Sequence, residues 1–275
     1  MASGPTRTKG LRNEYRVRLA KPFRRLKGAV RTTVIDNDAL GLGSDVDALI
    51  AAADDIQPAG RFSFSTDAEA QDEFNDWLER QANRGILEVM RRQRIRNGEH
   101  FTARYVRSAY SRGVQYADAR LRDQGVEPPD ASLRSTFNQP VHADTLEQLY
   151  TRSYDELATV TSDMQTAVRR ELTTGFSQGW NPRKTARNLT DRIDKIGITD
   201  AERLARTETM HSHNSASLRR YGQVGVEKVR VIGYSPCPEI CAPIVGNGPY
   251  PLDDIPLGGP PLHPNCRGAL APVVN

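Results

Sequence analysis

The sequence predicts a mainly α-helical chain that ends in a small α+β module. Apolar residues recur three and four positions apart over much of the chain before Gly225, which is typical of amphipathic helices. After Gly225 the stretch KVRVIGY is rich in β-branched residues and predicts a strand. The segment from Cys237 to Cys266 is full of proline and glycine and holds all three cysteines. We therefore expect long amphipathic helices, followed by a helix–strand–loop unit that is clamped near the C-terminus.

The first segment is strongly basic. Residues 1–31 hold ten lysines and arginines against one acid, Glu14, and Pro22 interrupts a roughly helical apolar pattern. The asymmetry predicts an arm, residues 1–40, that touches an acidic partner; a solvated, partly helical tail explains it equally well. The segment has no apolar run of the signal-peptide kind, so we expect no secretory signal. The candidate contacts to DNA or to a protein are Arg16, Arg18, Lys21, Arg24, Arg25 and Lys27.

Residues 41–175 are expected to form a helical body. A capping box, Thr66 with Glu69, opens its first helix. The last helix has an apolar stripe long enough to pack on neighbouring helices or on another subunit. We expect helices from Thr66 towards Ile95, from about Phe101 to Arg122 and from about Asp144 to Thr174.

Residues 176–275 are expected to form the α+β module. Asn181 is a good N-cap and is followed by proline at the first helical position. Thr199 and Glu202 form a second capping box that opens the next helix. Pro128-Pro129 is a competing domain boundary.

The cysteine-rich segment has the spacing of a metal site. Three residues separate Cys237 from Cys241, two separate His263 from Cys266, and the 21 residues between the pairs include six prolines and four glycines. Two close pairs of soft ligands joined by a loop predict a tetrahedral zinc site, and four protein ligands would make it structural. The CxxxC spacing is wider than the usual CxxC, and a metal-free loop with buried cysteines remains the alternative.

A second constellation lies in LARTETMHSHNSASLRRYG, from Leu204 to Gly222. On a helix, Glu208 and His211 share a face with residues expected to pack inward. A buried carboxylate needs a partner, and we expect an arginine such as Arg206 or a backbone group. A catalytic carboxylate with a nearby histidine is one interpretation; a polar contact that holds the helix to the strand and loop is favoured.

These motifs together resemble one family. ARTET, HNSAS, YGQVGV, a strand, a cysteine pair and PPLHPNCRG follow in the order found in phage Mu F-like head morphogenesis proteins, over roughly residues 145–272. The chain departs from the family pattern at Gly268, where a further cysteine is frequent, and at Ser235, where an acid is common. The matching residues are Arg206, Thr207, Glu208 and Asn214 on the helix and Cys237, Cys241, His263, Pro264, Cys266 and Arg267 in the terminal motif.

The resemblance implies a non-enzymatic minor head protein of a tailed virus. Such proteins associate with the portal at one capsid vertex and act in head assembly. It implies the portal protein as partner, with several copies around it, and the major capsid protein and packaged double-stranded DNA as further candidates. The expected location is the virion head, and the host cytoplasm during assembly; no membrane partner is expected.

Two other classes of function stay open. Related modules are fused to toxins, so a zinc-dependent or transferase-like enzyme is one alternative, and Asp253-Asp254 is its candidate metal pair. No P-loop, nucleophile elbow or HExxH motif supports an enzyme. A zinc-bearing nucleic-acid-binding protein is the other alternative, although the basic residues lie far in sequence from the cysteines.

Overall fold

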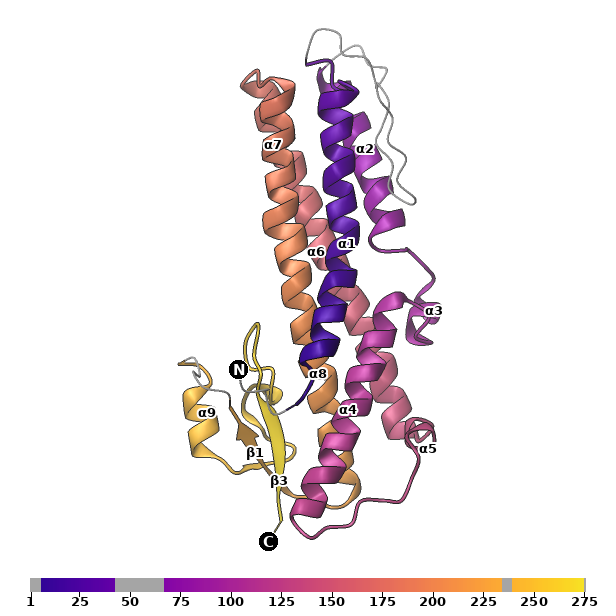
Figure 1. The fold of residues 1–275 in the computed structure, drawn as a ribbon, viewed down its shortest axis with the longest axis vertical. Coiled ribbons are helices and arrows are strands. Elements are labelled where there is room, and N and C mark those ends of the chain that lie inside the picture. Colours follow the sequence, from indigo (N-terminus) through magenta and orange to yellow (C-terminus); the bar gives the residue numbers. More distant parts are fainter. Residues whose placement is uncertain (1–5, 43–66, 234–238, 275) are drawn as a thin grey trace. The chain divides into compact units, whose positions relative to one another are not determined.

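The computed structural model describes residues 6–42, 67–233 and 239–274 (Figure 1). It is mainly helical with a three-stranded antiparallel sheet near the C-terminus, as the sequence predicted. The chain forms two compact units that do not follow the expected boundaries at residues 40 and 175. The first unit comprises Met1–Arg16, Arg91–Tyr154 and Arg203–Asn275, and the second comprises Val17–Met90 and Asp155–Glu202. The boundaries differ because three long helices each contribute residues to both units.

The second unit is a bundle of long helices. It contains most of α1 (Lys9–Arg31), α2 (Asp67–Gly85), the C-terminal half of α6 (Pro140–Ser177) and α7 (Pro182–Arg192). The side chains of Leu19, Phe23 and Leu26 on α1 are fully buried. The apolar spacing in the basic segment therefore marks a core helix. The alternative of a solvated tail is therefore wrong for Lys9–Arg31, and contact of the basic residues with an acidic partner stays a prediction.

Helix α1 continues through Pro22, contrary to the predicted interruption. Its last residue is followed by a π-helical turn, Thr32–Asp36. Proline removes one helical hydrogen bond. The burial of Pro22 among the apolar residues of the same face offsets that loss, because packing contributes most of a helix's stability in a protein.

Two other predicted helix boundaries differ from the structure. The helix expected to run towards Ile95 ends at Gly85 as α2, and α3 (Arg92–Arg96) is separate. Thr199 does not start a new helix, because its backbone (φ −64°, ψ −44°) continues the π-helical segment Ile193–Ile198 into α8 (Thr199–Gln223). Its hydroxyl donates to Asp194 O, so the expected capping box is wrong here.

The predicted cap at Asn181 is confirmed. Its side-chain oxygen accepts a hydrogen bond of 2.9 Å from the backbone N–H of Lys184, and Pro182 follows at the first helical position. The other predicted capping box is Thr66 with Glu69, and Thr66 lies outside the described residues.

The first unit packs helices against a small sheet. Its longer helices are α4 (Phe101–Asp123), residues 140–154 of α6 and most of α8, and it also contains the short α5 (Leu133–Phe137). Arg220 of α8 is 1% exposed and forms a two-pronged ion pair with Asp118 of α4, at 2.6 and 3.2 Å. Helices α4 and α8 also approach closely at Gly113, where a Cβ atom would lie 2.2 Å from His213 O.

The sheet has the strand order β2–β1–β3 and is antiparallel. The predicted strand is β1 (Lys228–Ile232), in the centre, with Val229 and Val231 buried. The edges are β2 (Tyr250–Pro251) and β3 (Ala269–Val273). Pro272 is tolerated because β3 is an edge strand. In sequence, helix α9 (Ala242–Asn247) lies between β1 and β2, and a 3₁₀ turn (Pro256–Gly258) lies between β2 and β3.

A search of the described helices for one long and apolar enough to cross a bilayer found none.

The close approach at Gly113 gives a stability test. Gly113→Ala should lower the free energy of unfolding by about 1–3 kcal/mol, because the added methyl group would overlap His213 O and the Ala216 Cβ. Chemical denaturation monitored by circular dichroism measures the change. Gly28→Ala is the matched control: a Cβ there meets nothing within 4 Å, so it should be neutral or stabilise α1 by up to about 1 kcal/mol. Equal effects of the two substitutions would contradict the predicted contact.

Candidate functional site

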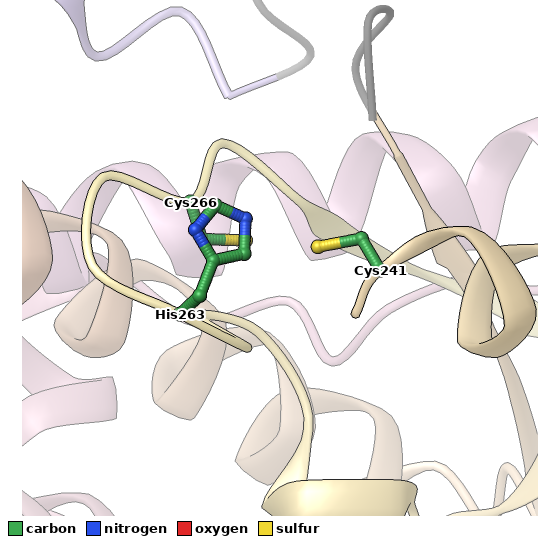
Figure 2. Close-up of side chains that lie close together, drawn as sticks. All are labelled: Cys241, His263 and Cys266. Atoms are coloured by element: carbon green, nitrogen blue, oxygen red, sulfur yellow. The ribbon is translucent and has the colours of Figure 1, made fainter. Parts of the chain in front are cut away.

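Three of the four predicted metal ligands come together. The three candidate ligand atoms all lie within 4.8 Å of one another, and they come one each from Cys241, His263 and Cys266. Figure 2 shows the three side chains converging, with the Cys241 sulfur directed towards the other two. Both sulfurs belong to buried residues, and His263 is partly exposed. Cys237, the fourth predicted ligand, lies outside the described residues. Two thiols and an imidazole so close together could hold a metal ion.

Local backbone structure positions each donor. Cys241 immediately precedes α9, and its carbonyl accepts from the N–H of Val245 in the first turn of that helix. His263 and Cys266 belong to one turn, closed by a hydrogen bond of 3.1 Å from Cys266 N to His263 O. Asn265 permits this turn by adopting a left-handed backbone conformation (φ 67°).

His263 and Cys266 each form a hydrogen bond with a neighbouring backbone group. The Nδ1 of His263 lies 2.7 Å from Pro264 O, and a carbonyl only accepts, so Nδ1 carries the proton. In a neutral ring this leaves a lone pair on Nε2, which suits metal ligation. The backbone N–H of Gly268 donates to the Cys266 sulfur at 3.4 Å, which helps to fix the position of this sulfur in the turn.

The helix motif and the terminal motif are joined by Asn214. This side chain is 1% exposed, and its Nδ2 donates to Met210 O at 3.0 Å and to Gly268 O at 3.1 Å. About two helical turns further on, the Tyr221 hydroxyl donates to Leu270 O at 3.0 Å. Helix α8 therefore holds the backbone that directly follows Cys266.

Glu208 is fully buried, and its Oε1 accepts a hydrogen bond of 3.2 Å from the Nε of Arg152 on α6. The sequence suggested an arginine such as Arg206; the structure supplies Arg152. No local sequence signal could identify it, because the two residues lie 56 positions apart. The pair joins α8 to α6, which favours the structural interpretation of Glu208.

His211 takes part in a different arrangement from Glu208. Its Nδ1 lies 3.1 Å from the Ser215 hydroxyl, and both residues line a cleft of about 790 Å³. Arg152 and Arg219 line the same cleft, and Arg219 Nε donates to the Thr145 hydroxyl at 3.1 Å. The cleft also contains two acids, Glu227 and Asp253, so its charges are balanced.

The remaining motif residues lie at the surface or support the backbone. The Thr207 hydroxyl donates to Arg203 O one turn earlier. Arg206 and Arg267 lie near Arg12 of α1, and their positive charges, together with burial as the main cause, lower the pKa of Arg12. Pro264 is exposed, and its carbonyl accepts from His263.

The predicted contact residues on α1 lie in the second unit, except Arg16. Arg18 pairs with Glu88 at 3.1 Å and Arg24 with Glu202 at 3.4 Å. Lys27 pairs with Asp194. Lys21 is exposed, and Arg16 and Arg25 are partly exposed. Acids of the same unit therefore neutralise part of the positive charge that suggested an arm.

Comparison of the chain with family models, with curated proteins and with solved structures found no match.

His213 is a buried residue that sequence reasoning missed. It is fully buried on α8, with the Tyr116 ring 5.1 Å away, centroid to centroid. Burial lowers its pKa to about 4; a contact with Asn214 opposes this shift, and the positive charge of Arg112 adds to it. The histidine is therefore neutral in the folded protein at pH 7.

The low pKa of His213 predicts acid sensitivity. Below pH 6.5 the unfolded chain binds a proton at this position, whereas the folded protein does so only near pH 4. Stability due to neutral His213 is thus present above pH 6.5 and lost on acidification, by about 3 kcal/mol in total. Denaturation curves between pH 7 and 4 measure it. His213→Gln should flatten the pH dependence and His211→Gln should not; an unchanged slope in His213→Gln would refute the assignment.

Proposed function

We propose that this chain is a non-enzymatic minor head protein of a tailed virus, whose C-terminal loop is held by a structural zinc ion and docks on the portal. The proposal has two parts, the metal and the partner, and each has its own support.

The donor chemistry supports zinc. Thiolate and imidazole together are typical zinc ligands, and a tetrahedral ion at roughly 2.0–2.3 Å from each donor sets donor separations of about 3.5–3.8 Å. The observed limit of 4.8 Å is wider by about 1 Å. Small side-chain rotations at Cys241 and His263 would close that difference. Cys237, four residues before Cys241, would supply the fourth corner and exclude water from the ion.

The observation that carries the head-protein proposal is the hydrogen bond from Asn214 to Gly268 O. It joins the two halves of the Mu F-like motif, which are 54 residues apart in the chain, into one structural element. The residues that resemble the family hold one another in position, as a shared structural role requires.

Exposed apolar side chains beside the metal ligands suggest the docking surface. Ile240, next to Cys241, is 50% exposed, and Leu257, in the loop between the ligands, is 66% exposed. Leu257 also has a left-handed backbone conformation (φ 58°), which is strained for a residue other than glycine. We propose that these two side chains contact the portal, and that several copies of the chain surround it in the virion head.

The metal part predicts about one zinc per chain in protein purified without chelator, measured by plasma emission spectrometry. His263→Ala and Cys266→Ser should each reduce bound zinc and lower the melting temperature, because the loop loses its metal cross-link. Cys237→Ser tests the fourth ligand in the same way. His211→Ala is the control and should keep full zinc. A fully folded native protein without metal would exclude a structural zinc.

The partner part predicts co-purification with the portal protein of the virus that encodes this chain. After co-expression of both full chains, Ile240→Ser/Leu257→Ser should reduce the amount of portal recovered and leave zinc content unchanged. Val89→Ser is the matched control, because Val89 is 61% exposed and belongs to the second unit. Absence of a native complex would refute portal docking whatever the zinc analysis shows.

A further inference from the structure

A second cleft in the first unit is distinctly positive. It has a volume of about 530 Å³, within the usual range for small-ligand sites. It lies between α4 and the residues that precede α1. Its chemically active lining consists of Arg7, Arg112, Gln115, Tyr116, Arg120 and Asp123.

The charges of this cleft are not balanced. Arg120 pairs with Asp123 at 3.3 Å and lies over the Tyr116 ring, 5.3 Å from its centroid. Arg7 and Arg112 are both exposed, and neither has an acidic partner among the described residues. Two positive charges therefore face this cleft without compensation. This distinguishes it from the cleft at His211, where two acids balance two arginines.

Hydrogen bonds position the Arg112 side chain and the backbone around Arg7. Arg112 donates through Nη1 to Arg7 O at 3.0 Å, which leaves its other guanidinium hydrogens for a ligand. The backbone of Arg7 is left-handed (φ 50°). The flanking Thr6 and Thr8 hydroxyls lie 2.9 Å apart, so one donates to the other. The remaining hydroxyl proton is directed to the Met210 sulfur on α8, which lies 3.8 Å from Thr6 and 3.7 Å from Thr8, and these contacts fix this turn.

The field of Arg112 also reaches into the protein. Its charge contributes to lowering the pKa of buried His213 behind the cleft. Among the described residues that line the cleft, three arginines therefore face a single acid, Asp123, which pairs with Arg120.

We propose that this cleft binds phosphate groups. Arginine forks match phosphate geometry and can bond two oxygens at once, and a phosphate group offers more acceptors than a carboxylate to two guanidinium groups. Gln115, exposed on the same wall, adds an amide donor. The site concerns different residues from the basic ones on α1. It does not rest on the viral-head proposal, since the phosphate can come from DNA or from a small molecule.

Binding of two probes to the full chain tests the site. A short double-stranded DNA, followed by fluorescence anisotropy at several salt concentrations, tests the polymer as the source. Pyrophosphate, followed by calorimetry, tests the free ligand. Arg7→Gln/Arg112→Gln should weaken binding about tenfold, and for DNA it should reduce the slope of log K against log salt by about 2, because two phosphate contacts are lost.

Arg80→Gln/Arg170→Gln is the matched control. It removes the same charge from two exposed arginines of the second unit, and it should leave binding unchanged. Gln115→Glu is a second test variant that places a negative charge in the cleft, removes only the Gln115 amide donor and keeps both arginines, so it serves if the double variant folds poorly. Binding of either probe with selective loss in the cleft variants supports the site and identifies the source. Equal loss in the cleft and control variants, or no binding of either probe to the native chain, overturns it.

Discussion

The hydrogen bond from Asn214 to Gly268 O is the contact on which the C-terminal half of the first unit depends. Backbone groups of the segment before β3 have few partners in regular structure, and buried carbonyls must be satisfied. The Asn214 amide, itself 1% exposed, satisfies one of them directly beside Cys266. An apolar residue at this position would leave that carbonyl without its partner, at a cost of about 1–3 kcal/mol. A buried amide on α8 thus sets the position of the turn that carries His263 and Cys266.

The same constraint explains why a loop so rich in proline and glycine can present three donors at one point. Helix α8 fixes the chain after Cys266, and β1 fixes β3 through five residue pairs. Cys241 is fixed from the other side by the first turn of α9. Only His263 depends mainly on its own turn. Binding of an ion would therefore cost little conformational entropy of the chain at Cys266 and more at His263. We expect metal binding to change the structure most at His263.

Periodicity predicted the helices well, and it failed where a local signal competes with distant packing. The cap at Asn181 is local and was predicted. Thr199 carries an equally good capping pattern, but Gly197 packs against Phe23 and Met164, and that contact favours a continuous helix. Strand β3 was not predicted because Ala-Leu-Ala-Pro-Val has little β-propensity; it forms through pairing with β1. The candidate metal site was predictable because cysteine and histidine spacing survives in the sequence. The Arg152–Glu208 pair was not, since only the fold brings those residues together.

The distribution of charge shows most clearly how a local sequence pattern can differ from what the fold produces. Counting lysines and arginines along residues 1–31 indicated a basic arm, but Arg18, Arg24 and Lys27 each pair with an acid that is distant in sequence. Conversely, the five arginines of α4 are accompanied by two acids and are less concentrated than the basic residues of α1, so its sequence did not mark it as an anion site. Its Arg112 becomes significant only beside Arg7, which is 105 residues away. The electrostatic field at a surface depends on which charges the fold leaves uncompensated, and a local net charge measures only which charges are near in sequence. An anion should therefore be sought at the cleft between Arg7 and Arg112 rather than along the most basic stretch of the chain.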